Sequence, residues 1–444
     1  METNEKKLTL FSLAWPIFIE TALFMTLGIV DVFVLSQYND LAAGAVNTAN
    51  QATSITTIVF SAISTASAVL ISQYLGAKKE ASASKIAALS ITLNFVAGLI
   101  VSAVFLVFNQ PILSFIGAKG EILSLAGEYL SIVGGFMFLQ AVLTAMAVII
   151  RNHGMTKISM YVTVGMNVLN TGLDILFVLG FDMGVSGVAI ATSISRVLGT
   201  AVLAAVLFKK VEKPSIFKHL KPFPLKDVGS MLKIGIPGAT ETFLYNLSQL
   251  VITSIVLNYM AAEQLIAKTY VQNITMFFYV FAIAIGQASQ IMTGHLIGAG
   301  KTDEAYKSGV KAHRFALLIA LSISLIGALL RYPLMGLFTS NAEVIELGAT
   351  VLLINVALEF GRSTNLVLIA SLRGAGDVYF PTACAIFSNW AISVLGSFLL
   401  AVVAGWGLYG LWTALAADEI VRAILMMLRW KSGKWKTKSV VKEH

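Results

Sequence analysis

The sequence predicts an all-α polytopic membrane protein with twelve transmembrane helices in two pseudo-symmetric six-helix bundles. Three observations predict this fold: the apolar composition, the long apolar runs, and a repeat at half the chain length. Of 444 residues, 57% are hydrophobic and 12% are charged, and the mean hydropathy is +0.82. These values lie outside the usual range of soluble domains, so most of the chain is expected in lipid.

The repeat is carried by several matching positions. Arg151-Asn152-His153-Gly154 returns as Arg373-Gly374-Ala375-Gly376, a displacement of 222 residues. The same displacement, or one that differs by a single residue, relates Gly76 to Gly298, Pro111 to Pro333, Glu121 to Glu343, Asn167 to Asn389, Pro16 to Pro237, Glu20 to Glu241, and Gly184 to Gly407. Internal duplication in a hydrophobic chain is typical of carriers whose substrate path lies between two halves.

Each half contains six apolar segments long enough to cross a bilayer. The predicted spans are about 8–37, 44–75, 86–108, 122–150, 158–180 and 185–208, then 228–259, 264–297, 308–330, 344–371, 379–404 and 407–430. Three prolines and six lysines between the halves indicate a polar linker. The predicted domains are therefore an N-terminal lobe (1–208), a linker (209–226), a C-terminal lobe (227–430) and a basic tail (431–444).

The basic residues predict the orientation of the chain in the membrane. The termini and the loops after even-numbered spans hold 25 of the 31 lysines and arginines, including Lys6 and Lys7. By the positive-inside rule both termini and the linker are cytoplasmic. Because each half has an even number of spans, the two halves enter the membrane in the same direction and form a parallel repeat.

Several function classes are disfavoured by the sequence. The positive net charge is explained by the loops beside the spans, so no nucleic-acid partner is expected. The single cysteine, Cys384, excludes an internal disulfide. Gly300-Lys301-Thr302 resembles the end of a phosphate-binding loop, but His295 stands where that loop needs glycine. With no nucleophile–base or metal constellation, we expect no enzyme and no bound cofactor.

Acidic residues inside the spans are the candidate functional groups, because a carboxylate in hydrocarbon costs about 3 kcal/mol. Asp31 lies about 9 Å inward from the outer end of the first span, and Asp174 and Thr192 fall at a similar depth. Asn170 is one helical turn from Asp174, on the same face. These four residues could form an oxygen cage for Na⁺ or a proton-binding site.

The second half does not repeat these acids. The positions equivalent to Asp31 and Asp174 hold Ile252 and Gly396. We therefore predict that ion coupling belongs to the first half.

A substrate cavity is expected from polar and aromatic residues on other spans. Glu20 and Glu241 each follow a proline by one helical turn, which places them near an expected bend. Two further charged pairs at helical spacing can pair with each other, Glu359 with Arg362 and Asp418 with Arg422. The cavity residues proposed from the sequence are Glu20, Glu241, Asn246, Phe277 and Arg362.

The spans, the parallel halves and the Arg-x-x-Gly closing spans 4 and 10 resemble the multidrug and toxic compound extrusion (MATE) family in its prokaryotic form. The resemblance covers about residues 8 to 430. Its other markers are Trp15-Pro16, Gly28-x-x-Asp31, Gln73-Tyr74-Leu75-Gly76-Ala77 and Leu372-Arg373-Gly374-Ala375-Gly376-Asp377.

The resemblance implies antiport, in which a proton or Na⁺ enters while an organic, often cationic, compound leaves. One branch of the family places its cation or proton site at positions matching Asp31, Asn170, Asp174 and Thr192. Another branch uses an acidic pair in the second lobe, but the corresponding positions here hold Tyr245 and Arg362. A sodium site of that second kind is therefore not expected.

Two alternatives remain open at this point: a flippase for lipid-linked oligosaccharides from the related exporters, and a channel or receptor. For the exporter we expect a monomer in the plasma (inner) membrane, contacting lipid and small organic substrates.

Overall fold

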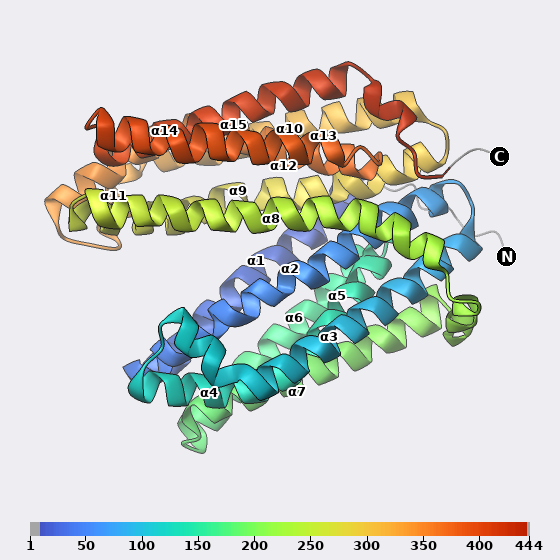
Figure 1. Cartoon of the computed structure of the whole chain (residues 1–444), viewed down its shortest axis with the longest axis horizontal. Coiled ribbons are helices and arrows are strands. Elements are labelled where there is room, and N and C mark those ends of the chain that lie inside the picture. The colour runs from blue at the N-terminus through green and yellow to red at the C-terminus, as the bar shows by residue number, and fades with distance from the viewer. Residues whose placement is uncertain (1–8, 442–444) are drawn as a thin grey trace. The chain divides into compact units, whose positions relative to one another are not determined.

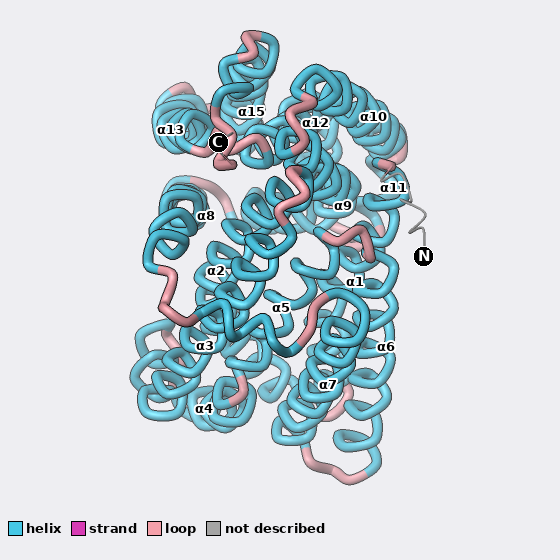
Figure 2. Tube along the Cα trace, turned by 90° about the vertical axis from the view of Figure 1, so that its right-hand side faces the viewer, coloured by secondary structure: helices cyan, strands magenta, loops and turns pink. Residues whose placement is uncertain are grey.

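The computed structural model describes residues 9–441, and of residues 27–29 it describes the backbone alone. Lys6, Lys7 and Lys442, which contribute to the predicted orientation, lie outside the described residues, as does the side chain at position 28. The described chain forms two compact units that meet between Ala239 and Thr240. In both units the elements are helices joined by short loops, and no strand occurs among the described residues (Figures 1 and 2).

The first unit contains six long helical segments in the predicted order. Two of them end in a π-helical stretch, and one is broken into two helices. The elements are α1 (Leu10–Ser36), α2 (Asp40–Gly76), α3 (Glu80–Ile116), α4 (Gly120–Gly135), α5 (Met137–Asn152), α6 (Thr156–Asp174) with η1 (Ile175–Gly180), and α7 (Gly184–Val206) with η2 (Leu207–Val211), followed by the short η3 (Pro214–Leu220).

The second unit repeats this order after α8, which crosses the boundary between the units. The elements are α8 (Leu225–Tyr259), α9 (Ala262–Gly298), α10 (Thr302–Leu329) with α11 (Arg331–Gly336), α12 (Ala342–Gly374), α13 (Tyr379–Ser388) with η4 (Asn389–Val394), α14 (Leu395–Ser397) and η5 (Phe398–Val403), α15 (Gly407–Lys431), and the short η6 (Lys434–Thr437).

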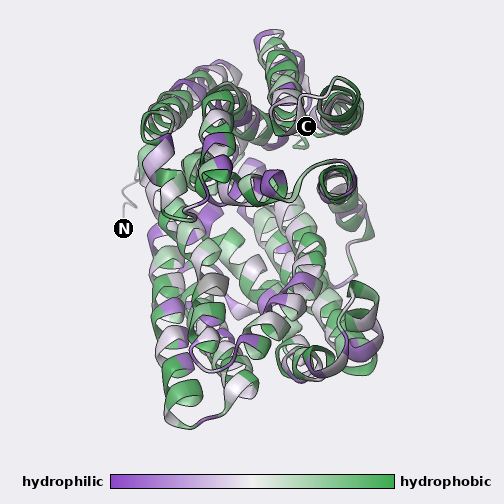
Figure 3. Cartoon of the chain, turned by 90° about the vertical axis from the view of Figure 1, so that its left-hand side faces the viewer, coloured by the Kyte–Doolittle hydropathy of each residue, from purple (hydrophilic) through white to green (hydrophobic). Residues whose placement is uncertain are grey.

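These helices confirm the predicted twelve-helix fold. Nine helices of the described chain are long and apolar enough to cross a membrane, and α4 with α5, bent by 48°, forms one more. The two remaining segments, α8 and α15, are more polar. In α15 the charged residues in the middle of the helix are Asp418, Glu419 and Arg422. Figure 3 shows hydrophobic residues along much of the length of the helices, as lipid contact requires.

The repeated glycines have a conformational reason. Gly154 and Gly376, which end the two Arg-x-x-Gly motifs, have φ of 77° and 92°. Gly184 and Gly407, which begin α7 and α15, have φ of 53° and 54°. A residue with Cβ adopts this left-handed region only at a cost, so the repeat preserves glycine where the chain reverses between helices.

A short segment follows the sixth helix of each unit and packs against a helix of the same unit. In the first unit η3 packs against α3 through Ile216, which is buried. In the second unit the ring of Trp435, also buried, stacks on Trp430 of α15 with 4.1 Å between the ring centroids. The predicted linker and the predicted basic tail therefore both contribute a buried apolar anchor.

Candidate functional site

The acidic residues predicted for ion coupling are buried in the first unit. Asp31 is 4% exposed on α1, and Asp174 is 0% exposed at the last residue of α6. Helices α1 and α6 pack along each other, and α7 packs against α6. Asn170 and Thr192 are also buried, so all four predicted residues lie in the interior of this three-helix arrangement.

The structure brings the four residues together in two contacts. The Asn170 Nδ2 atom donates to the Thr192 Oγ1 atom at 3.5 Å, which joins α6 to α7. The carboxyl groups of Asp31 on α1 and Asp174 on α6 interact electrostatically with each other. Because two neighbouring buried carboxylates repel each other when both are ionised, this arrangement suits a site that takes up a positive charge.

Several oxygen atoms of this site have no hydrogen-bond donor among the described residues. They are Asp31 Oδ1, both carboxyl oxygens of Asp174, and Asn170 Oδ1. None of the ion pairs formed by described residues includes Asp31 or Asp174. Buried oxygens left unbonded cost free energy, so this site is suited to a bound proton or to a small hard cation such as Na⁺.

Two residues that the sequence analysis did not place in the site lie beside it. Tyr129 of α4 interacts electrostatically with Asp31 and Asp174. Arg196 of α7 interacts electrostatically with Asp31 and Tyr129 without forming an ion pair. A lone tyrosine in an apolar helix carries no sequence signal for such a role, and the partner of a lone arginine within a span depends on which helices become neighbours.

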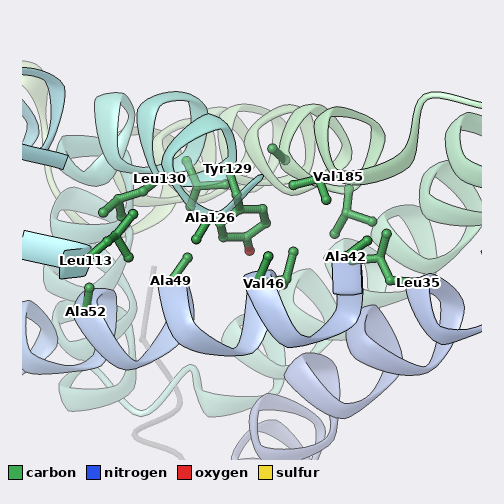
Figure 4. Close-up of a cluster of buried hydrophobic side chains, with 14 of the residues drawn as sticks. Leu35, Ala42, Val46, Ala49, Ala52, Leu113, Ala126, Tyr129, Leu130 and Val185 are labelled. Atoms are coloured by element: carbon green, nitrogen blue, oxygen red, sulfur yellow. The ribbon is translucent and has the colours of Figure 1, made fainter. Parts of the chain in front are cut away.

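Apolar packing holds Tyr129 in this position. Figure 4 shows its ring surrounded by small and branched side chains, among them Val46 and Ala49 of α2 and Val185 of α7. Its hydroxyl group donates to Asn50 Oδ1 at 3.3 Å. The predominance of alanine on α2 lets α4 approach closely, so the ring enters the core next to the acidic pair.

The two glutamates predicted for the substrate cavity each form an ion pair with the arginine of an Arg-x-x-Gly motif. Arg151 Nη1 lies 2.9 Å from Glu20 Oε1, and Ser159 donates to the same carboxylate. In the second unit Arg373 Nη2 lies 2.6 Å from Glu241 Oε2, and Thr382 donates to that carboxylate. The repeat thus preserves a glutamate, an arginine and a hydroxyl group as one unit.

Both charged pairs predicted in the second half are confirmed. Arg362 lies 2.9 Å from Glu359, and its guanidinium carbon lies 4.7 Å from the centre of the Tyr279 ring. Arg422 lies 2.8 Å from Asp418 and 3.1 Å from Glu419. Every one of these buried carboxylates therefore has a cationic partner.

The other two predicted cavity residues lie on the surface of the second unit. Phe277 of α9 is exposed. Asn246 of α8 is also exposed, and its amide donates to the Thr242 carbonyl at 3.0 Å. Neither residue contacts Glu241 or Arg362 through a hydrogen bond among the described residues.

Comparison with known families decides the identity. A family model described as MatE matches residues 16–176 and again residues 237–399. The chain belongs to the MatE family. Because one model matches each half once, the match also confirms the internal repeat. MATE proteins are transporters, so this protein is a transporter and not an enzyme.

Full-length bacterial relatives support this membership. The protein is 38% identical to YisQ of Bacillus subtilis, named an uncharacterized transporter, over 97% of this chain and 95% of that protein. It is 28% identical to “Probable multidrug resistance protein NorM” of Thermotoga maritima, over 99% of this chain and 95% of that one. The multidrug export protein MepA of Staphylococcus aureus is 25% identical over 81% of this chain and 78% of its own length.

Solved MATE structures share the fold. A MATE transporter crystallised in a bent conformation superposes with a TM-score of 0.89 at 20% identity, covering 96% of this chain and 95% of that one. A variant of the Vibrio cholerae transporter VcmN superposes with a TM-score of 0.88 at 21% identity, covering 95% of each chain. At these identities the likeness establishes the MATE architecture alone.

Proposed function

We propose that this MATE transporter is a secondary antiporter that exports organic, often cationic, drugs or toxic metabolites in exchange for protons or Na⁺. The observation that carries the proposal is the buried Asp31–Asp174 pair, which forms no ion pair among the described residues. The similarity to NorM and MepA, both named for multidrug resistance or export, supports the choice of substrate class.

The coupling ion acts at the acidic pair. A proton shared by the two carboxyl groups, or Na⁺ held by their oxygens together with Asn170 and Thr192, removes the repulsion between two buried negative charges. Ion binding then stabilises the conformation in which α1 packs closely on α6.

Exchange follows from differential affinity. An ion drives a conformational change only if it binds one state more tightly than the other. The acidic pair provides this difference, because separating α1 from α6 would expose the carboxyl groups to water and release the ion. Substrate release is coupled to the same movement, and rocking of the two lobes returns the carrier to its starting state.

The setting of the carrier follows from its charge distribution. We place the carrier in a plasma membrane. We place both termini and the linker on its cytoplasmic side, because the basic residues gather there. A monomer is sufficient for this mechanism, since one chain supplies both lobes.

The proposal is tested by transport in reconstituted inside-out vesicles. We expect uptake of a fluorescent cationic dye when a proton gradient is imposed, and a parallel experiment with a Na⁺ gradient alone identifies the coupling ion. Vesicles without protein provide the background. If neither gradient drives uptake above this background, the antiport mechanism is wrong.

A further inference from the structure

The second unit contains a cavity that the ion site does not explain. It has a volume of about 180 Å³ and lies between α8, the α13–η4 segment and α15. Tyr245 of α8, Asn389 and Trp390 of η4, and Arg422 of α15 all line it. Glu241 of α8 also lines the cavity and forms its ion pair with Arg373.

Three polar atoms of the residues lining this cavity have no hydrogen-bond partner among the described residues. They are Asn389 Oδ1, Trp390 Nε1 and Arg422 Nε. Asn389 is 4% exposed and Arg422 is 7% exposed, so neither side chain is solvated from outside the unit. An unmade hydrogen bond on a buried group costs about 1–3 kcal/mol. One acceptor and two donors around a single cavity therefore favour a polar occupant.

Two of these residues lie in an irregular part of the backbone. Asn389 and Trp390 begin the π-helical segment η4, where the chain turns more widely than in an α-helix. π-helical turns occur frequently at functional sites, because the wider turn changes the direction of side chains.

The charges around the cavity are nearly balanced. Arg373 pairs with Glu241, and Arg422 directs one terminal nitrogen to Asp418 and Glu419. The Nε atom of Arg422 therefore takes no part in these ion pairs. A wall of this kind offers directed hydrogen bonds without a large net charge, and Tyr245 and Trp390 add two aromatic rings.

We propose that this cavity binds an aromatic group that carries both a carbonyl or carboxylate oxygen and an amino group. The oxygen accepts hydrogen bonds from Trp390 Nε1 and Arg422 Nε, and the amino group donates to Asn389 Oδ1. The volume is below the roughly 300 Å³ at which pockets for whole drug-sized ligands begin, so one or two rings fill it. The proposal that the transporter exports this ligand rests on the proposed function. The proposal that the cavity binds it does not.

The test uses the single native cysteine of the chain. In a Cys384→Ala background, Ile386→Cys places one thiol on the cavity wall. Its reaction with methanethiosulfonate ethylammonium is followed in detergent without any gradient. We expect 2-aminobenzamide, which carries the required carbonyl and amino groups, to slow this reaction. Tetraphenylphosphonium, an aromatic cation without hydrogen-bonding groups, should leave it unchanged. The thiol of Phe387→Cys, at an exposed position of the same helix, is the control.

Calorimetric titration of the wild-type protein with 2-aminobenzamide measures the same binding without a cavity variant. Trp390→Phe keeps an aromatic ring and removes the donor, and it should weaken binding roughly five- to tenfold. Trp406→Phe, at an exposed tryptophan outside the cavity, should not change it.

Each other outcome overturns the proposal. Absence of both protection and binding heat means that the cavity holds water only. Equal protection by both compounds means that the polar atoms do not select the ligand. Because neither measurement needs a gradient, failure of binding is distinguishable from failure of ion-coupled export.

Discussion

In the first unit Asp31 and Asp174 are buried against each other without an ion-pair partner, whereas in the second unit Glu359 and Asp418 are equally buried and each is paired with an arginine. Burying a carboxylate is costly in both places. In the second unit an arginine offsets that cost permanently. In the first unit no arginine forms an ion pair with either acid, so a bound proton or cation can supply the compensating charge, as an ion-coupled carrier requires.

The repeat sharpens this comparison. Asp31 and Asp174 correspond to Ile252, which lies in the apolar core, and to Gly396, where an added Cβ would lie 3.3 Å from Ala414. Conversely, Glu359 corresponds to Met137, which is buried in the first unit's core. At these equivalent positions, one unit thus has a charged residue where the other has an apolar residue.

The largest expected effect is loss of export in Asp174→Asn. The amide cannot take up a proton and carries no charge to attract Na⁺, so gradient-driven dye uptake should fall to the level of protein-free vesicles. The melting temperature should not fall, because the substitution removes a buried charge that has no ion-pair partner.

Asp182→Asn is the matched control for this variant. Asp182 is an exposed loop residue with a φ of 57°, a conformation that asparagine tolerates. Uptake by this control should equal that of the wild type. Full uptake by Asp174→Asn would show that the unpaired acids of the first unit are not the coupling site.

Arg422→Met should instead affect stability, because it leaves Asp418 and Glu419 without their cation. Removing one partner of a buried ion pair costs about 3–5 kcal/mol. We expect a clear decrease in the melting temperature of the purified protein. Adding Asp418→Asn to the same variant should recover part of it. An unchanged melting temperature would contradict the structural role given to these pairs.

A smaller effect, equal in both units, is expected at the repeated Glu–Arg pair. Arg151→Met and Arg373→Met each leave one partly buried glutamate with only a hydroxyl donor. The expected loss is about 1–3 kcal/mol in each case. Glu20→Gln should restore stability in the Arg151 variant, and Glu241→Gln in the Arg373 variant, as measured by thermal unfolding. A large difference between the two losses would show that the repeat preserved the residues but not their role.

The sequence predicted much of this fold and part of the site, for physical reasons. Long apolar helices and the positive-inside bias are encoded locally, so the twelve spans could be predicted without knowledge of packing. Asp31 and Asp174 were recognisable because charge in hydrocarbon is rare. Tyr129 and the Arg151–Glu20 pair were not predicted, since each depends on which helices become neighbours. Residues 131 positions apart form that ion pair.

The smallest effect concerns the segments that follow the sixth helix of each unit. Burial raises the pKa of Glu212 above its ordinary 4.5, and hydrogen bonds from Ser84 lower it in part. Glu212 lies near His153 and His219 and is influenced by the charge of Glu80, whereas the segment after the sixth helix of the second unit is anchored by the uncharged Trp435. A raised carboxyl pKa favours the protonated form of the folded protein. The first unit should therefore lose stability as the pH rises from about 4.5 through the folded-state pKa.

Glu212→Gln should remove this dependence, with a difference in melting temperature of no more than about 2–4 °C. Trp435→Ala should lower the melting temperature equally at every pH. If both variants showed the same pH profile, the titrating group would not be Glu212.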